Sequence, residues 1–231
     1  RLDTDLGLFS CRPELGADAT ELFNVLTCLS RQREFCRFLV APDGLRSRAL
    51  ELIDCEAANA RAGREARVII KINHLVDPGM VSALYAASAA GVTIDLIVRT
   101  VCSVVPGVPG LSPTVHLRSV VGEYLEHSRV LGFANGGTWE WYLGSADFME
   151  RNLDRRVEVV IPVEDADARA RLRDLCEEML TDDRNSWQLG SDGVWRSTEE
   201  ITGKEGTRSV FRALKSRALE GATASTRTSM D

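Results

Sequence analysis

The chain has 231 residues, of which 44% are hydrophobic, 27% charged and only 6% aromatic. Because one domain usually takes about 100–200 residues, this length predicts one domain with appendages, and the apolar share excludes a wholly disordered chain. The sequence has no run of about 18 consecutive apolar residues, so no membrane-spanning helix is predicted. The first residues, Arg1 to Asp5, resemble neither a signal peptide nor a usual start, so we expect a piece of a longer protein.

The formal net charge is −6 at pH 7, from 28 Lys and Arg against 34 Asp and Glu. Residues 203–231 contain six basic and three acidic side chains, which leaves this tail at +3 and the preceding residues at −9. An acidic total argues against nucleic acid or another polyanion as a ligand of the whole surface. A phosphate site in this chain must therefore be a local concentration of basic side chains.

The six cysteines lie far apart and form no CxxC pair. Neither a disulfide framework nor a structural zinc site is therefore predicted. We expect reduced, buried thiols of a cytoplasmic protein at Cys11, Cys28, Cys36, Cys55, Cys102 and Cys176.

In the first half of the chain, helical and strand-like patterns alternate. The near-continuous apolar runs favour strands of a buried, largely parallel sheet, and glycine or proline marks several ends. The expected elements, in chain order, are helix 16–29, a strand within 34–42, helix 45–62, strand 67–72, helix 78–90 and strand 92–99.

After a Pro- and Gly-rich loop over 100–113, strands dominate. Gly136-Gly137 is typical of a hairpin between two of them. The expected elements are strands 115–121, 127–133, 139–143 and 156–163, helix 166–180, and a terminal hairpin of 187–189 and 194–196. This order indicates an α/β fold with a mixed, largely parallel sheet flanked by helices. Beyond Thr202 the chain is rich in Ser, Thr and basic residues, so residues 201–231 are predicted to be a disordered tail, except for one amphipathic helix over 209–219.

Polar residues stand at the ends of several predicted strands, where open α/β sheets bind ligands. Lys71 and Asn73 are two apart and share one side of a strand, as do His127 and Arg129, while Arg99 closes another strand. Grouped basic residues of this kind favour a phosphate site. Arginine donates paired hydrogen bonds to phosphate oxygens, and histidine transfers protons near neutral pH.

Each of these residues also has an ordinary interpretation. A lone arginine at a strand end is commonly a surface charge, and a histidine beside a charge is commonly a surface or capping residue. His74 and His116 keep that interpretation here.

The spacing H-x-R, hairpin, G-S-A-D, R-N resembles the H-x-K…G-S-x-N pattern of the phospholipase D superfamily, whose members carry phosphoryl groups on histidine. Arg129 stands where Lys is usual, and Ala134 where Asp is usual.

A larger set of motifs, in one register over residues 1–200, resembles the carboxy-terminal region of bacterial type-1 polyphosphate kinase. These motifs are Thr4-Asp5-Leu6-Gly7-Leu8, Leu39-Val40-Ala41-Pro42, Leu75-Val76-Asp77-Pro78, Ile97-Val98-Arg99, Pro106-Gly107-Val108-Pro109-Gly110-Leu111-Ser112, Tyr124-Leu125-Glu126-His127-Ser128-Arg129, Ser145-Ala146-Asp147 and Arg151-Asn152-Leu153-Asp154-Arg155-Arg156-Val157-Glu158-Val159.

The resemblance implies reversible transfer of the terminal phosphoryl group of ATP to polyphosphate through a phosphohistidine, with Mg²⁺, in a phospholipase-D-like domain. It implies that residues 1–32 end a preceding catalytic domain and that 33–200 form the carboxy-terminal domain. It makes His127 the catalytic acid or base and Arg99 a nucleotide-phosphate ligand. The residues implied to line the same tunnel are Lys71, Asn73, Arg129, Asp147 and Arg156.

The sequence departs from the family pattern at three points. Asp3 stands where a nucleotide-contacting Tyr is usual, and its carboxylate would repel phosphate. Thr100 replaces a usual Gly. The phosphorylated histidine and the magnesium ligands of the family lie upstream of residue 1, so the chain alone is expected to be inactive and to hold no metal.

Two alternatives remain open at this point. A diverged module could bind polyphosphate or nucleotide without catalysis, which Asp3 favours, and a phospholipase-D-type phosphodiesterase could use one histidine from each of two chains. The resemblance further implies ATP, ADP and polyphosphate as partners, a cytoplasmic location, and a homo-oligomer for the full-length enzyme.

Overall fold

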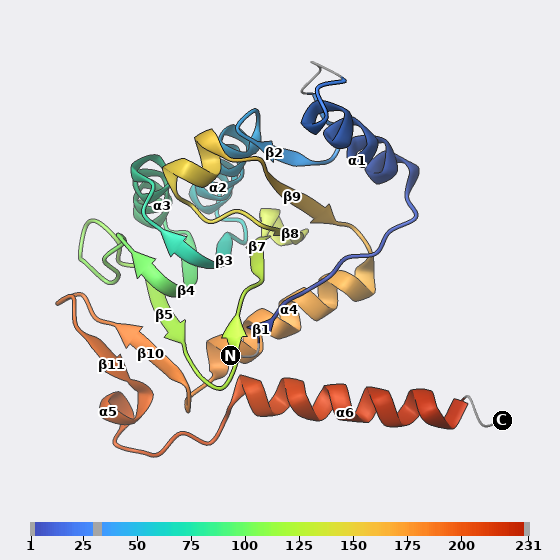
Figure 1. The fold of residues 1–231 in the computed structure, drawn as a ribbon. Coiled ribbons are helices and arrows are strands. Elements are labelled where there is room, and N and C mark those ends of the chain that lie inside the picture. The colour runs from blue at the N-terminus through green and yellow to red at the C-terminus, as the bar shows by residue number, and fades with distance from the viewer. Residues whose placement is uncertain (1–2, 30–33, 229–231) are drawn as a thin grey trace.

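The computed structural model describes residues 3–29 and 34–228 (Figure 1). Its helices are α1 (Pro13–Leu26), α2 (Leu45–Arg61), α3 (Pro78–Ala89), α4 (Ala166–Thr181), α5 (Thr198–Thr202) and α6 (Val210–Thr228), with short turns η1 (Asn135–Gly137) and η2 (Arg151–Arg155). Its strands are β1 (Asp3–Thr4), β2 (Leu39–Ala41), β3 (Arg67–Leu75), β4 (Thr93–Cys102), β5 (Val115–Val120), β6 (Leu125–Glu126), β7 (Arg129–Phe133), β8 (Glu140–Gly144), β9 (Glu158–Val163), β10 (Ser186–Leu189) and β11 (Trp195–Ser197).

One nine-stranded sheet forms the centre of the described fold, in the order β11-β10-β5-β4-β3-β7-β8-β9-β2. The predicted α/β class with a mixed sheet flanked by helices is confirmed. Its parallel part is smaller than predicted, because β3, β4 and β5 run parallel to one another while the other neighbours in this sheet are antiparallel. An apolar run reports burial on both faces and not the direction of the neighbouring strand, which explains the difference.

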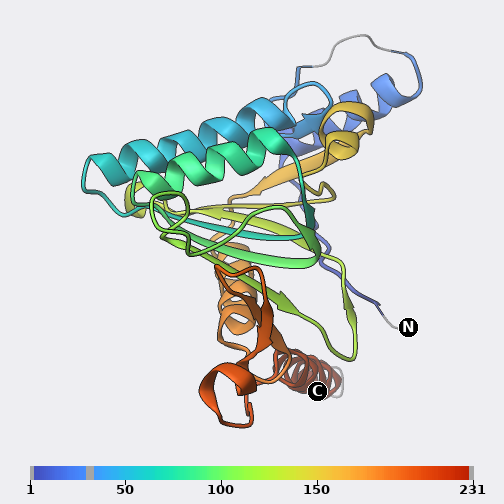
Figure 2. The same cartoon turned by 90° about the vertical axis from the view of Figure 1, so that its left-hand side faces the viewer.

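Helices cover both faces of the sheet. Figure 2 shows α2 and α3 side by side on one face and α4 on the other. Side chains of a strand alternate between faces, so Ile70 of β3 belongs to the core beneath α2 and α3, whereas its neighbour Ile69 packs with Leu172 and Cys176 of α4.

The β7–β8 hairpin is formed as predicted, with Gly136 and Gly137 of η1 both at positive φ. Within it, Gly132 pairs with Trp141, whose ring stacks on Trp139 at a centroid distance of 5.5 Å. A Cβ atom on Gly132 would lie 2.8 Å from the Trp141 ring. A side chain at position 132 would therefore displace this indole.

The amphipathic helix predicted over 209–219 is present as the first part of α6, which continues to Thr228, whereas α5 begins before the predicted tail. Val210 and Phe211 at the start of α6 are buried, in one cluster with Val120, Leu175 and Met179. The amphipathic pattern gives α6 an apolar face that packs against this cluster, and the Ser and Thr residues of the helix do not prevent this packing. None of the helices in the described ranges has both the length and the apolar character needed to cross a bilayer. The expected boundary at residues 32–33 and the last residues, 229–231, lie outside the described part.

All six cysteines are free thiols, as predicted, but they are not uniformly buried. Cys176 is buried against the sheet and Cys102 is half-buried. The other four are exposed: Cys11, Cys28, Cys36 and Cys55.

Two valines of β4 test where the core lies. Val98 is 2% exposed and Val101 is 47% exposed. Val98→Ala should lower the free energy of unfolding by about 2 kcal/mol more than Val101→Ala, because only the first removes buried methyl groups. Both changes cost similar strand propensity, so urea denaturation of the matched pair isolates burial. Equal losses would contradict the described packing.

Candidate functional site

The candidate site lies where the carboxyl end of β3 meets the amino end of β7. These two strands are antiparallel, with Lys71 opposite Val130, so the beginning of β7 reaches the same edge as the end of β3. The short ribbon of β1 and β6 adds a third segment, because Thr4 pairs with Glu126 and its carbonyl accepts the His127 amide at 2.9 Å. Segments near residues 5, 74, 128 and 147 are thereby brought together.

His127 is held between a carboxylate and a guanidinium. Its Nδ1 lies 2.8 Å from Asp5 Oδ2, and Arg129 Nη1 donates to Nε2 at 2.9 Å and to the His127 carbonyl at 2.6 Å. An arginine only donates, so Nε2 is the acceptor and the ring proton sits on Nδ1, directed at Asp5. The His127 side chain is 48% exposed, which leaves this imidazole accessible to a ligand.

Asp5 responds to this contact. Burial alone would raise its pKa, but the hydrogen bond from His127, the Leu6 amide, and the charges of His127 and Arg129 lower it below the usual value. An ionised Asp5 in turn favours the Nδ1–H tautomer of His127.

Asp147 is the buried carboxylate of the site, with a side chain only 5% exposed. Its Oδ1 accepts the Asn73 backbone N–H at 2.8 Å and Arg129 Nε at 3.3 Å, and its Oδ2 lies 2.9 Å from His74 Nδ1. Burial raises its pKa, but hydrogen bonds from His74 and Asn73, with the charge of Arg129, lower it below the usual value. We call Asp5, His127, Arg129, Asp147 and His74 the histidine network.

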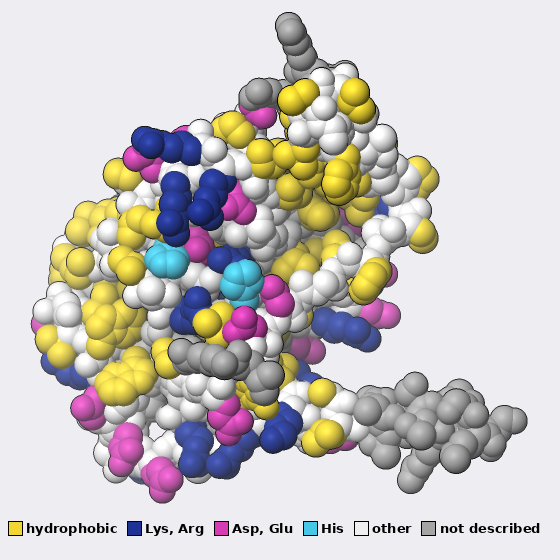
Figure 3. All heavy atoms as spheres, viewed as in Figure 1, with side chains coloured by type: hydrophobic (Ala, Val, Ile, Leu, Met, Phe, Trp, Pro, Cys, Tyr) yellow, Lys and Arg dark blue, Asp and Glu magenta, His cyan; other side chains and the backbone are white. Residues whose placement is uncertain are grey.

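On the face seen in Figure 3, histidine side chains lie among basic and acidic side chains, at an opening between apolar regions. Charges of both signs meet there, so the network is locally balanced and not a purely cationic patch. Its cations are already hydrogen-bonded, and an incoming phosphate would have to compete with carboxylates for Arg129.

His74 is the functional candidate that sequence reasoning missed. The β3–β4 register shifts between Ile72 and His74, but the extra residue lies in β4, because the step from Ile72 to His74 faces the longer step from Val98 to Val101. β3 keeps its alternation, so His74 shares the face of Ile70 and Ile72. The place of His74 next to Asn73 at a strand end is a usable sequence signal, and sequence reasoning also gave Asp5 and Glu126 no role.

Lys71 faces away from the histidine network. It is directly opposite Val130, so it shares a face with Ser128 and not with Arg129. Lys71 Nζ donates to the Ser128 carbonyl at 2.6 Å and to Ser128 Oγ at 2.9 Å, and lies 3.6 Å from Glu126. Burial lowers the pKa of this ammonium, which Glu126 opposes. The predicted convergence of all basic groups on one ligand is therefore not formed in the described residues.

The other predicted residues are spread over this end of the sheet. A small cavity of about 10 Å³ joins Arg99 to Lys71, Asn73 and Glu126. Arg99 is half-buried and its carbonyl accepts Ser119 Oγ at 3.2 Å. Arg156 is exposed just after η2, and within the described residues its side chain makes no hydrogen bond or ion pair. Asp3 is exposed on β1, opposite Leu125.

The loop that carries Asp147 is fastened to the sheet. Phe148 bridges to Leu75, and its carbonyl accepts the amides of Val76 and Asp77 at 2.9 and 3.0 Å. Arg46 then joins Asp77 at 2.7 Å to Asp154 at 2.6 Å. The hydrogen bond from Arg46 holds the pKa of Asp77 below its usual value.

No group of three or more His, Cys, Asp or Glu side chains is placed to hold a metal ion in residues 3–29 and 34–228. The carboxylates of the histidine network are each occupied by histidine or arginine. Within the described ranges, the carboxylates of the network are therefore not arranged as a set of ligands for a divalent cation.

Asp147 should make stability depend on pH. Its folded pKa is below the usual 3.8, so its contribution is present above about pH 4 and is lost as pH falls through the folded pKa. Asp147→Asn should therefore lower the free energy of unfolding by about 2 kcal/mol at pH 7, and by less in acid.

Urea denaturation between pH 7 and acid, with exposed Asp54→Asn on α2 as control, measures this difference. Parallel pH profiles for wild type and Asp147→Asn would contradict the assigned hydrogen bonds.

Comparison with known proteins identifies the family of this chain. Residues 38–209 match the polyphosphate kinase C-terminal domain 2 family. The chain is 49% identical over 219 residues to a polyphosphate kinase of Thermosynechococcus vestitus, covering 94% of this chain and 30% of that protein. It spans 26% to 30% of the length of the curated relatives it matches.

One solved structure of a polyphosphate kinase supports this family. Polyphosphate kinase of Porphyromonas gingivalis superposes with a TM-score of 0.83 at 33% identity, over 94% of this chain and 33% of that one. A phospholipase D family member, Nuc of Salmonella typhimurium, gives a TM-score of 0.44 at 15% identity over 60% of this chain and 91% of that one, too distant to inform the site. With a family match over most of its length, this chain belongs to the polyphosphate kinase C-terminal domain 2 family.

Proposed function

We propose that this chain supplies the carboxy-terminal part of a polyphosphate kinase, which reversibly transfers the terminal phosphoryl group of ATP to polyphosphate through a phosphohistidine. The observation that carries the proposal is the accessible His127 imidazole, fixed by Asp5 at 2.8 Å and Arg129 at 2.9 Å. The family membership supports the same reaction, and the relatives' names supply the substrate class.

His127 is suited to move a proton in this reaction. With its Nδ1–H directed at ionised Asp5, Nε2 is the atom that accepts a proton, and Asp5 stabilises the resulting imidazolium. The same Nε2 then donates that proton to a leaving phosphate oxygen. A phosphate that draws Arg129 toward itself would at the same time free Nε2 for this transfer.

Arg129 and Arg99 are the proposed phosphate ligands of this end of the sheet. Arg129 is held by His127 and Asp147, and it presents a planar fork suited to phosphate oxygens. Arg156 and Asn73 belong to the same proposal, as second contacts along a longer phosphate chain. Lys71 is proposed to act through Ser128 and Glu126, by positioning the segment that carries His127.

The phosphorylated nucleophile and the magnesium ligands are proposed to come from the rest of the enzyme. The chain spans only 30% of its Thermosynechococcus vestitus relative. ATP, ADP and polyphosphate would bind between this part and the remainder. Asp3, exposed where the family usually has Tyr, is proposed to weaken nucleotide contact by repelling phosphate.

The chain alone should show no exchange between ATP and polyphosphate. A hybrid in which it replaces the corresponding 30% of the Thermosynechococcus vestitus enzyme should exchange radiolabelled phosphate, because the hybrid restores the missing nucleophile. Exchange by the isolated chain would overturn this proposal. Polyphosphate binding by the hybrid without transfer would favour the non-catalytic binding module.

Variants in the hybrid test the assigned roles. His127→Gln should lower the exchange rate about 100-fold or more, the range for loss of a general acid or base, and should flatten its dependence on pH. Arg129→Gln should chiefly raise KM for ATP, because it removes a phosphate ligand while Gln retains the polar stem.

Arg61→Gln, an exposed change at the end of α2, serves as the control for both. Activity of His127→Gln equal to that of Arg61→Gln would remove His127 from the reaction. Unfolding midpoints measured in parallel separate loss of chemistry from loss of fold.

A further inference from the structure

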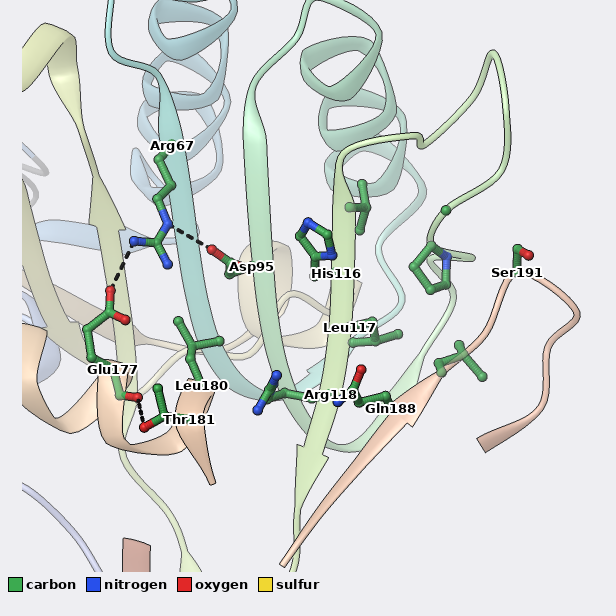
Figure 4. Close-up of a pocket in the computed structure, with 14 residues that line it drawn as sticks. Arg67, Asp95, His116, Leu117, Arg118, Glu177, Leu180, Thr181, Gln188 and Ser191 are labelled. Atoms are coloured by element: carbon green, nitrogen blue, oxygen red, sulfur yellow. Dashed lines mark hydrogen bonds and ion pairs between the residues drawn. The ribbon is translucent and has the colours of Figure 1, made fainter. Parts of the chain in front are cut away.

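A second polar cleft lies at the other end of the sheet from the histidine network. It has a volume of about 470 Å³ and is formed by β5, β10, α4, the loop after β4 and the β10–β11 turn (Figure 4). No member of the histidine network lines it. Strand geometry separates the two sites, because the cleft uses the early residues of β3 and β4, such as Arg67 and Asp95, whereas the network adjoins their late residues.

Four donors face this cleft. His116 and Arg118 are two apart on β5 and so point to the same side, and Gln188 is directly opposite Arg118 on β10. Ser191 closes the rim from the β10–β11 turn, where its Cβ lies 3.8 Å from the position of a Cβ on Gly107. In the described residues the side chains of His116, Gln188 and Ser191 make no hydrogen bond or ion pair.

Arg118 has no carboxylate partner within ion-pair distance among the described residues. Its Nη1 donates weakly to the Met179 and Asp182 carbonyls at 3.3 and 3.4 Å, at the end of α4. Burial lowers its pKa, although Asp95 and Asp182 act in the opposite sense. The rest of its guanidinium fork is unused, and a half-buried guanidinium in this state favours an anion.

The opposite wall of the cleft holds one arginine and two carboxylates, so it offers no free positive charge to a ligand. Arg67 joins Asp95 at 2.8 Å and Glu177 at 3.0 Å, as the dashed lines in Figure 4 show. These carboxylates leave the cleft without a large positive excess. A ligand with one compact anionic group satisfies Arg118, whereas a long polyanion would also meet Asp95 and Glu177.

We propose that this cleft binds a small phosphate monoester. The phosphate would accept hydrogen bonds from Arg118, His116, Gln188 and Ser191, and the organic part would lie against Leu180 of α4. Donors from two strands and a turn suit the tetrahedral oxygens of phosphate better than the two oxygens of a planar carboxylate. The site is separate from the proposed kinase chemistry and does not depend on it.

The full chain, labelled with ¹⁵N, tests this by titration with inorganic phosphate, glycerol 3-phosphate and tripolyphosphate. Inorganic phosphate and glycerol 3-phosphate should shift the Gln188 side-chain amide and the Ser191 and His116 backbone signals saturably. Glycerol 3-phosphate should bind at least as tightly as phosphate, and tripolyphosphate should bind more weakly at these residues.

Arg118→Met should weaken phosphate binding about tenfold or more, the loss expected for a charged hydrogen-bond donor. Arg118 also caps α4, so His116→Gln provides a second variant that leaves this cap in place and should weaken binding as well. Exposed Arg173→Gln on α4 is the control and should not change affinity. Absence of saturable shifts, or unchanged affinity in folded His116→Gln and Arg118→Met, would overturn the proposal, as would tighter tripolyphosphate binding.

Discussion

The geometry of the histidine network depends on one buried carboxylate. Asp147 accepts hydrogen bonds from the Asn73 amide, His74 and Arg129, which belong to the end of one strand and the start of another. Only an ionised group with several acceptor positions can serve all three donors in a nearly dry place. Backbone hydrogen bonds to Phe148 hold the loop that carries this carboxylate. Arg129 supplies the opposite charge, and its other hydrogen bonds fix the position of His127.

The change of strand direction at β3 explains how distant segments converge. β3 has parallel β4 on one side and antiparallel β7 on the other. The end of β3, the end of β4 and the start of β7 therefore share one edge of the sheet. Lys71 and Arg129 lie on opposite faces at this edge. The Lys71 side chain lies in a buried cavity, and the Arg129 side chain lies on the more open face.

Most helices and strands and the hairpin at Gly136-Gly137 could be predicted from hydrophobic spacing and turn residues, because both signals lie within a short stretch of sequence. Strand direction depends on partners far along the chain, and the sequence therefore over-predicted the parallel part. The pairs Lys71 with Asn73 and His127 with Arg129 were readable from spacing. Their placement on opposite faces was not, since it depends on the register of Lys71 against Val130. His74 lies on the face of Ile72 by simple alternation, but its contact with Asp147 depends on a loop far along the chain, which the sequence around His74 does not show.

Gly132, which lies against the Trp141 ring, limits where the chain can gain or lose residues. Gly132 is the residue of β7 that fits under this indole, so a slip of one residue would place Leu131 or Phe133 there and exchange the two faces of β7. That exchange would send Arg129 into the cavity of Lys71. Insertions and deletions between β5 and β7 are therefore expected to be tolerated only before Leu125, because the Trp141 ring fixes the position of Gly132 and, three residues away, the face on which Arg129 lies.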